Sequence, residues 1–420
     1  MKVGYAKREI TPPVGIRLGG YAHRLGKPSQ IVHDPLYASA IFIESSDGEE
    51  AVLIHADVLG IYKDLADEIK STASRKVGIA PNKIFLTTTH THSGPETIIP
   101  MWPNTFPYSK EEKKMFEDWL NSFKEKVVET VFESVNEISH SLAKVGTTNV
   151  PNLTFNRTYK NGVVDTQVPF IFFDGEERNK KILILNYTCH PVCNTDFGIS
   201  ADYPGGLYLN FKRYGIESFF TTGATGDIDP LMKGREFISK MGSEISLAVL
   251  SELSSAKEIR DEEIRIEKRG ISLSLRTVID SEKAKTKFER MLKKCRDKLN
   301  DTECLSGLLY ADEEYEIAKE NRTHIESVIQ ALILGDNLVF ISVPGELFVE
   351  FGLKIKNFAK LKGYSHAIIA CYSEDYIGYI PDNRAYEMGA YEATLARWSR
   401  ITPGSGDLIT SEILKILEND

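Results

Sequence analysis

Three histidines and one glutamate follow directly on apolar, β-rich stretches of the sequence: His90, His92, His190 and Glu346. In an extended chain, residues i and i+2 lie on one face, so His90 and His92 are expected to point into the same space. Open α/β sheets gather their functional side chains where strands end. Two or three histidines that converge with one carboxylate and leave a position open form a hydrolytic zinc site. The spacing therefore indicates a metal site, and it leaves open the alternative that each histidine only completes a strand end.

Strands separated by helices would bring these side chains together. β-rich stretches predict strands at residues 38–43, 50–56, 83–89, 181–187, 218–222 and 338–343. Apolar side chains at helical spacing predict helices at residues 110–143, 239–253 and 347–361. We predict an α/β fold of layered, mixed β-sheets with flanking helices. The chain shows no internal repeat and no low-complexity linker, so we expect residues 1–420 to form a single catalytic domain.

The character of the sequence changes between about residues 254 and 321. Charged residues dominate this stretch, as at 283–298 and 312–320, and apolar residues recur at helical intervals. We interpret it as a charged helical insertion, folded as an exposed hairpin. Two roles fit this pattern: a lid or oligomer contact, or a solvated excursion with no part in the chemistry. The second is the commoner reason for a run of charges.

Composition limits the classes of function. The 420 residues include 60 acidic and 51 basic side chains, and the net charge of −9 argues against a nucleic-acid binder, which needs a basic surface. Hydrophobic residues make up 42% and charged residues 26%, which supports a packed core rather than a disordered chain. No apolar run approaches the ~20 residues of a membrane span, so we expect no transmembrane segment. The N-terminus lacks the apolar run of a secretory signal, so we expect a cytoplasmic enzyme.

The five cysteines are scattered and odd in number: Cys189, Cys193, Cys295, Cys304 and Cys371. This distribution does not resemble a disulfide scaffold. Cys189 and Cys193 bracket His190 and would allow a thiolate metal site, but no second cysteine pair supports it. We therefore expect Cys189 and Cys193 to be small apolar packing residues.

Five sequence motifs occur in a recognisable order. They are residues 10–16 (ITPPVGI) with 19–22 (GGYA), residues 89–95 (THTHSGP), residues 155–158 (FNRT) with 164–166 (VDT), residues 343–346 (VPGE), and Tyr379 with Tyr391. In this order the chain resembles the N-terminal catalytic domain of the neutral, non-lysosomal ceramidase family. The matches extend from about residue 3 to residue 410, and the THTHSGP stretch is the most specific of them. Each motif alone is weak evidence for the resemblance, but five motifs in the same order are strong evidence.

The resemblance implies a zinc site and a set of residues around it. One zinc ion per chain would be bound by His90, His190, Glu346 and Tyr379. Beside the metal would lie His92, Arg157 and Tyr391. The tyrosine ligand rests on the resemblance alone, because the local sequence by itself favours a tyrosine packed within its own loop.

These residue types suit the hydrolysis of an amide. Zinc lowers the pKa of a bound water toward ~7 and polarises a carbonyl group. Arg157 and the hydroxyl of Tyr391 would stabilise the tetrahedral oxyanion. His92 would carry a proton to the leaving amine. The resemblance therefore implies a metal-dependent amidohydrolase.

The chain departs from the family at two points. Asp229, within residues 226–230 (GDIDP), stands where the family carries a serine in a GDVSP motif. A carboxylate cannot repeat serine acyl chemistry, so Asp229 would act as a base, bind a second cation, or hold hydroxyl or amine groups of the substrate. An Asx-turn in a tight loop is the structural alternative. The sequence also ends soon after residue 410, so we expect no C-terminal β-sandwich domain.

Other polar residues near these motifs are weaker candidates. Asp202 lies in a loop that resembles a family loop near the second zinc histidine, and we expect it to hold a metal-bound histidine. The residues that would line the substrate cleft near the N-terminus are His23, Arg24, His33 and Asp34.

We predict a zinc-dependent amidohydrolase that cleaves a linear N-acyl amide. The substrate would be ceramide-like, as in sphingolipid metabolism, or a smaller N-acyl or N-acetyl amine such as an acylated amino sugar. This small molecule is the expected partner, and the sequence leaves the oligomeric state open. One alternative is a metal-dependent esterase or deacetylase that acts on a hydroxylated or sugar substrate. Another is a relative without catalysis that binds a lipid or sugar, which the presence of all seven implied pocket residues disfavours.

Overall fold

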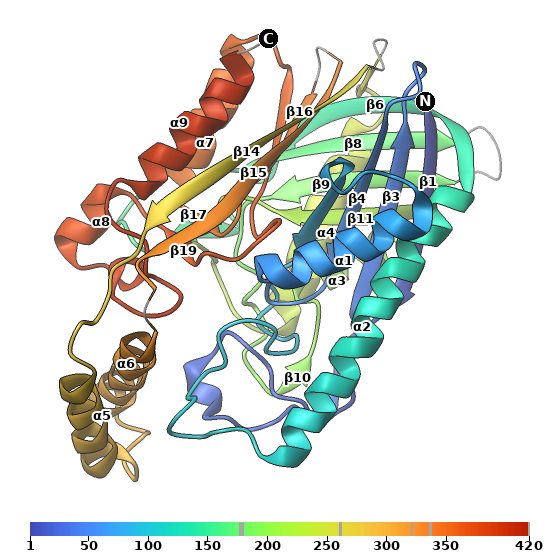
Figure 1. The fold of residues 1–420 in the computed structure, drawn as a ribbon. Helices are drawn as coiled ribbons and strands as arrows, with labels where there is room; N and C mark the ends of the chain where they lie inside the picture. The colour runs from blue at the N-terminus through green and yellow to red at the C-terminus, as the bar shows by residue number, and fades with distance from the viewer. Residues whose placement is uncertain (176–179, 260–262, 321, 336–337, 419–420) are drawn as a thin grey trace.

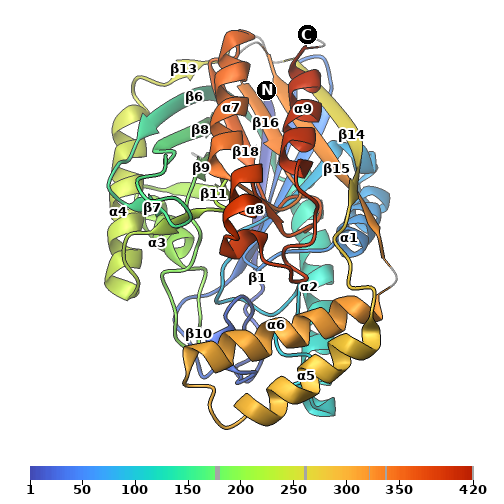
Figure 2. The ribbon, with the colours of Figure 1, turned by 90° about the vertical axis from the view of Figure 1, so that its left-hand side faces the viewer.

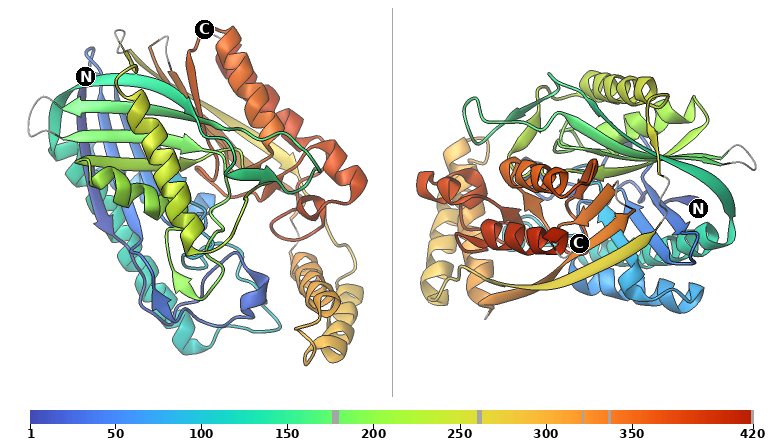
Figure 3. Two further views of the ribbon diagram at one scale, coloured as in Figure 1. Left: turned by 180° about the vertical axis from the view of Figure 1, so that it is seen from behind. Right: turned by 90° about the horizontal axis from the view of Figure 1, so that it is seen from above.

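The computed structural model describes residues 1–175, 180–259, 263–320, 322–335 and 338–418. Two β-sheets face each other, and helices cover the outer side of each sheet (Figure 1). Figure 3 shows these layers from behind and from above. The arrangement confirms the predicted α/β class with mixed sheets and flanking helices.

The larger sheet contains nine strands in the order β11-β9-β8-β6-β1-β3-β4-β5, with β13 added on β6. Its strands are β1 (Lys2–Glu9), β3 (Tyr37–Glu44), β4 (Glu50–Ala56), β5 (Ile84–Thr88), β6 (Ile138–Asn149), β8 (Gln167–Gly175), β9 (Lys181–Tyr187), β11 (Ile216–Thr222) and β13 (Lys257–Glu258). The pairs β4–β5 and β9–β11 are parallel, and the other pairs are antiparallel. The sheet is therefore mixed.

The smaller sheet has the order β14-β15-β16-β18. Its strands are β14 (Ile264–Ser274), β15 (His324–Leu334), β16 (Leu338–Ser342) and β18 (His366–Ala370). Only β16 and β18 run parallel. Three short pairs lie outside both sheets: β2 (Ile31–Val32) with β10 (Gly198–Ile199), β7 (Thr154–Asn156) with β12 (Ile228–Pro230), and β17 (Glu346–Leu347) with β19 (Tyr379–Ile380).

Apolar side chains between the two sheets hold them against each other. Phe85 of β5 meets Phe340 of β16 edge to face, with ring centroids 6.1 Å apart. Phe219 of β11 and Ile368 of β18 are fully buried in the same core. Burial of each such side chain contributes roughly 1.5–3 kcal/mol. This core fixes the relative positions of the strand ends that carry the functional residues.

Helices cover the outer faces of the two sheets (Figure 2). On the larger sheet lie α1 (Lys63–Val77), α2 (Lys110–Asn136), α3 (Tyr203–Lys212) and α4 (Arg235–Glu252). On the smaller sheet lie α7 (Val349–Leu361) and α9 (Ser405–Glu418), with the short α8 (Asn383–Met388) nearby. Among the described residues, no helix is both long enough and apolar enough to cross a membrane.

The charged insertion contains the helices α5 (Ser281–Cys295) and α6 (Thr302–Lys319), which stand away from the two sheets in Figures 1 and 2. The helical part is shorter than predicted, because residues 264–274 form β14 and pair with β15. The predicted end of the insertion at residue 321 lies outside the described residues. A disulfide joins Cys295 to Cys304 and so ties the end of α5 to the start of α6. Cys189 and Cys193 are free and buried, as expected of packing residues, and so is Cys371.

Two predicted helices also have different ends in the structure. The helix predicted over residues 110–143 stops at Asn136, because the chain from Ile138 pairs with β1 and β8 as strand β6. The helical spacing of apolar residues continues into a segment whose backbone hydrogen bonds go to the sheet instead. The helix predicted over 239–253 begins four residues earlier, at Arg235.

Candidate active site

Strands from both sheets end at one place in the fold. His90 follows β5, His190 follows β9, and Glu346 lies just beyond β16 in the short strand β17. The backbone amide of Cys371, after β18, donates to the carbonyl oxygen of Thr222 at the end of β11, at 2.9 Å. The two sheets thus meet at the ends of their strands, and the predicted gathering of polar side chains at strand ends is confirmed.

His90 and His190 present the same nitrogen to Glu346. The Nδ1–H of His90 donates to the carbonyl oxygen of Leu59 at 2.6 Å. The Nδ1–H of His190 donates to the carbonyl oxygen of Thr225, also at 2.6 Å. Their Nε2 atoms lie 3.6 Å and 2.9 Å, respectively, from one carboxylate oxygen of Glu346. All three functional side chains are buried.

This set of donor atoms fits a divalent cation. Each Nδ1 carries the proton that it donates to a carbonyl, so a ring that holds only this one proton presents an Nε2 lone pair to the carboxylate. Lone pairs that face a carboxylate repel it unless a cation or an extra proton lies between them. Burial lowers the pKa of His90 to about 4, which disfavours the extra proton at neutral pH. Imidazole nitrogen and carboxylate oxygen are ordinary zinc ligands, so the residues present suit the metal that the sequence predicted.

Two tyrosines that the sequence did not indicate hold Glu346 in place. The hydroxyl of Tyr376 donates to one carboxylate oxygen, and that of Tyr372 donates to the other at 3.3 Å. Burial alone would raise the pKa of Glu346, but its neighbours His90 and His190 and the hydrogen bond from Tyr376 lower it to about 2. Glu346 is therefore an anion at neutral pH. Both tyrosines come after β18, as His90 comes after β5. The expectation that polar side chains gather where strands end could therefore have identified them from the sequence.

His92 lies against the other two histidines. Its Nε2 atom is 3.2 Å from Nε2 of His90, and each of the three rings offers a nitrogen within 4.8 Å of the others. Its Nδ1 atom is buried and has no hydrogen-bond partner among the described residues. Burial, with the neighbouring His90 and His190, holds the pKa of His92 well below its ordinary value. A neutral His92 suits either of two positions, a third nitrogen ligand or a proton carrier beside the metal.

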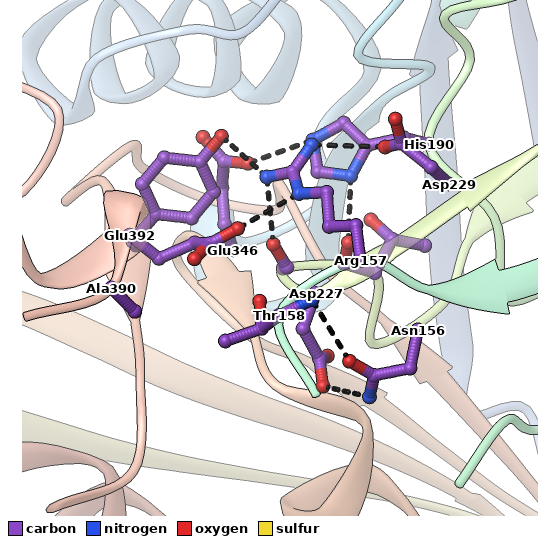
Figure 4. A network of polar contacts seen from close by, with 12 residues as sticks. Asn156, Arg157, Thr158, His190, Asp227, Asp229, Glu346, Ala390 and Glu392 are labelled. Atoms are coloured by element: carbon purple, nitrogen blue, oxygen red, sulfur yellow. Dashed lines mark hydrogen bonds and ion pairs between the residues drawn. The ribbon is translucent and has the colours of Figure 1, made fainter. Parts of the chain in front are cut away.

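Arg157 is the centre of an ionic network next to His190 (Figure 4). Its Nη1 and Nε atoms lie 2.9 Å and 2.8 Å from carboxylate oxygens of Asp229 and Glu392. Its Nη2 atom donates to the hydroxyl of Tyr379 and to the carbonyl oxygen of Gly226, both at 2.9 Å. Burial would lower the pKa of Arg157, but Tyr379 and the two carboxylates raise it well above its ordinary value. The guanidinium therefore keeps its charge inside the site.

Asp229 contacts two cations. Besides Arg157, the Nζ atom of Lys233 lies 3.2 Å from its second carboxylate oxygen. Burial would raise the pKa of Asp229, but Arg157, His190 and Lys233 lower it. An ionised carboxylate with a lowered pKa is a weak proton acceptor. Asp229 lies in strand β12, opposite Phe155 of β7, rather than in the Asx-turn that was the structural alternative.

The two tyrosines named by the resemblance lie side by side. Tyr379 stands opposite Glu346 in the parallel pair β17–β19 and is buried. Tyr391 begins a short 3₁₀-helix (Tyr391–Ala393), and its ring centroid is 5.8 Å from that of Tyr379. Half of its surface, 50%, is exposed, so Tyr391 is the more exposed residue of the two. Arg157 lies within about the same distance of both rings, at 5.6 Å and 5.9 Å from their centroids.

These side chains surround a small cavity with a mixed polar and apolar lining. Its polar lining residues are His90, His92, Glu346, Tyr376, Tyr379 and Tyr391. Its apolar lining residues, called the apolar wall below, are Leu59, Ile98, Ile99, Met101 and Trp398. The volume of the cavity is about 40 Å³, which is room for an ion and a few water-sized groups. The reacting part of a substrate would meet the histidines and Arg157 from this space.

The structure brings together all the residues that the resemblance implied, and their assigned roles remain predictions. The prediction for Asp202 is wrong: its carboxylate accepts from the amides of Asn194 and Tyr203 and caps α3, while His190 is held by a carbonyl. Arg24 is buried and donates to backbone oxygens, including that of His92. It therefore stabilises the backbone that carries His92. Glu392 was missed, because nothing in the sequence distinguishes it from other acidic residues near Tyr391.

The remaining N-terminal candidates make contacts of their own. His23 contacts the carbonyl oxygen of Thr195 at 3.0 Å, and His33 pairs with Asp196 at 2.8 Å. Asp34 accepts from the hydroxyl of Ser200. None of these three side chains lines the cavity described above.

Comparisons with known proteins agree in fold. No protein-family model matches the chain, and no curated protein matches it. Two solved structures are similar over 99% of this chain and 74% of theirs: a neutral ceramidase from Pseudomonas aeruginosa, with a TM-score of 0.77 and 16% identity, and a ceramidase complexed with C2, with a TM-score of 0.75 and 15% identity. At this identity the likeness establishes the fold, and it confirms the architecture that the motifs implied.

Proposed function

We propose that this protein is a zinc-dependent amidohydrolase that cleaves a linear N-acyl amide, either ceramide-like or smaller. The observation that carries the proposal is the convergence of the Nε2 atoms of His90 and His190 on Glu346, beside His92 and the Arg157 guanidinium. Acceptor groups that face one another in a buried space need a cation or a shared proton between them, and the lowered pKa of His90 disfavours the proton. The neighbouring cationic and hydroxyl groups are those that an amide needs for hydrolysis.

The zinc ion would be held by His90, His190, Glu346 and Tyr379. When bound, it would supply a Lewis acid that activates water and polarises the amide carbonyl. The Leu59 and Thr225 carbonyls keep the two imidazoles in the tautomer that leaves Nε2 free. The two tyrosines that donate to Glu346 orient its carboxylate. This support is what a preorganised ligand set requires.

Arg157 and Tyr391 would stabilise the negative charge that develops on the amide oxygen. The guanidinium is held rigidly by Asp229 and Glu392, and it stays charged because its pKa is raised. Fixed donors aimed at developing charge lower the barrier without reorganising during the reaction. Tyr391, exposed at the edge of the cavity, would add its hydroxyl as a second donor.

His92 would move the proton to the leaving amine. Its ring is neutral because its pKa is lowered, and its Nδ1 atom is not engaged by another described residue. A neutral imidazole accepts a proton as water attacks and returns it to the nitrogen as the C–N bond breaks. The same residues would also act on an ester, so the bond cleaved has to be established by experiment.

Asp229 would recognise the amine side of the substrate. Its lowered pKa makes it a poor base, and its two cationic neighbours leave little attraction for a second metal ion. A carboxylate beside Arg157 can accept hydrogen bonds from hydroxyl or amino groups on the leaving amine. This favours an amine that carries such groups, as both a sphingoid base and an amino sugar do.

The proposal is tested by metal analysis followed by turnover. The purified protein is analysed for zinc and then assayed, before and after chelation and zinc restoration, on N-acyl amides from acetylated amino sugars to long-chain N-acyl sphingoid bases, with matched esters. One zinc per chain and zinc-dependent release of amine support the amidohydrolase. Ester cleavage alone would favour the esterase, and binding without turnover of either would favour a non-catalytic binding protein.

A further inference from the structure

Helix α6 of the insertion carries two adjacent acidic residues that are completely buried. Asp312 and Glu313 both have an exposed fraction of 0%. A buried carboxylate is unfavourable unless hydrogen bonds or cations satisfy it. An exposed hairpin without a role would not need such residues, so their contacts indicate what the insertion does.

Asp312 holds the segment of chain that contains Asn104 and Thr105. Its Oδ1 atom accepts from the Asn104 side-chain amide at 2.7 Å, and its Oδ2 atom accepts from the Thr105 hydroxyl at 2.7 Å. The backbone amide of Thr105 donates to the same Oδ2 atom at 3.0 Å. One carboxylate thus fixes both backbone and side chains of this segment.

Glu313 holds a second segment of the chain, which contains Arg397 and Trp398, through its contacts with Arg397. Its carboxylate accepts from the backbone amide, Nε and Nη2 of Arg397 at 3.0, 2.9 and 2.7 Å. The Nη2 atom also donates to the carbonyl oxygen of Pro100 at 2.8 Å. Arg397 therefore connects α6 to both segments at once.

The two segments supply most of the apolar side chains that line the cavity. Ile98, Ile99 and Met101 come from the first segment, and Trp398 comes from the second. Ile99 has a φ of 43° and Trp102 a φ of 58°, which are strained values for such side chains. Strained backbone at a binding site persists only where its surroundings hold it in place. The contacts of α6 supply part of that support.

We propose that Asp312 and Glu313 are positioning residues that fix the apolar wall of the cavity and thereby limit the acyl group to a short chain. This inference rests on the proposed function. The cavity of about 40 Å³ is far smaller than the ~300 Å³ or more of sites that enclose larger ligands. With its wall held by buried carboxylates, the insertion is a fixed part of the site rather than a moving lid.

The test compares acyl selectivity in the wild type, in Asp312→Asn and in Glu313→Gln. Each amide would place N–H groups against existing donors and loosen the wall. The control is Glu314→Gln on the same helix, since the ion pair that Glu314 makes within the described part of the chain is with Lys287 of α5, near the surface. Thr105→Val is a milder variant for the case in which the other substitutions prevent folding. It removes one donor to Asp312 and keeps the shape of the side chain.

Two readouts separate this inference from the proposed function. The first is the ratio of kcat/KM for N-acetyl and N-dodecanoyl forms of one amine. The second is the ratio of Kd values for acetate or butyrate and dodecanoate on the zinc-loaded protein, which needs no turnover. We expect the wild type to favour the short chain by at least about tenfold in each ratio, and the wall variants to lose most of that preference, with unchanged zinc content.

The possible outcomes are distinct. A wild type that prefers long chains, or wall variants whose ratios match those of Glu314→Gln, would overturn the inference and leave the amidohydrolase intact. A wild type without turnover would overturn the proposed function, while the carboxylate affinities would still decide the inference. We expect faster amide hydrogen exchange at residues 97–107 and 395–399 in the wall variants, whether or not the protein turns over an amide. Unchanged exchange would count against the inference.

Discussion

The Nε2 atom of His190 lies 2.9 Å from a carboxylate oxygen of Glu346, while its Nδ1–H donates to the carbonyl oxygen of Thr225 at 2.6 Å. The second contact fixes the tautomer of the ring, and the first directs the remaining lone pair at an anion. A lone pair and a carboxylate attract each other only when a cation or a proton lies between them. The pair is thus already arranged as half of a metal site by residues outside it.

Replacement of His190 by alanine should abolish metal binding and activity together. Loss of one protein ligand from a zinc site weakens binding strongly, and the remaining residues cannot activate water alone. We expect less than about a tenth of the wild-type zinc content and at least a 100-fold fall in kcat/KM. The exposed His140 provides the matched control, since its replacement removes a histidine far from the cavity. Full zinc content in His190→Ala would contradict the ligand assignment.

Replacement of His92 by alanine should separate the two positions open to this side chain. As a proton carrier, its loss should leave one zinc per chain and lower kcat by about 100-fold or more. As a third nitrogen ligand, its loss should lower zinc content as the His190 change does. Zinc titration with a competing chelator, alongside kcat on one amide, distinguishes the two. We expect retained zinc, and metal loss in both variants would place His92 among the ligands.

Replacement of Asp229 by serine should change amine preference rather than metal content. The carboxylate sits between Arg157 and Lys233, so its removal releases a cation next to the substrate without disturbing the histidines. We expect KM to change by about tenfold for amines with hydroxyl or amino groups and to stay constant for amines without them. Lys233→Met is the companion variant, because it removes the second cation and keeps Asp229. Equal effects on every amine would argue against recognition by Asp229.

The sequence predicted the site better than it predicted the elements around it. His90, His190 and Glu346 could be found because each follows an apolar strand, and strand ends gather polar side chains. The end of α2 could not be found, since apolar spacing continued through residues whose partners lie in β1 and β8. Contacts that depend on folding, such as the carbonyl of Thr225 on His190, leave no trace in residue type because every residue has a carbonyl.

The stability of the metal-free protein should depend on pH through His90. An unfolded histidine protonates near pH 6.5, whereas burial lowers the pKa of His90 in the fold to about 4. Between these values the unfolded state binds more protons, so the free energy of unfolding falls as pH falls. A shift of this size corresponds to about 3 kcal/mol lost by pH 4. Asp227 and Glu96 change the free energy of unfolding in the opposite direction as pH falls, because burial raises the pKa of each to about 7.

The measurement is therefore a difference between two proteins. Urea unfolding of chelator-treated wild type and His90→Gln at pH 7, 6, 5 and 4 cancels the contributions of groups that His90 does not affect, such as Asp227 and Glu96. Because glutamine does not titrate, the stability of the variant relative to the wild type should improve by about 3 kcal/mol from pH 7 to pH 4. A difference that stays constant over this range would mean that His90 titrates alike in the folded and unfolded chains. The neutral lone pair on which the metal site depends would then have no support from burial.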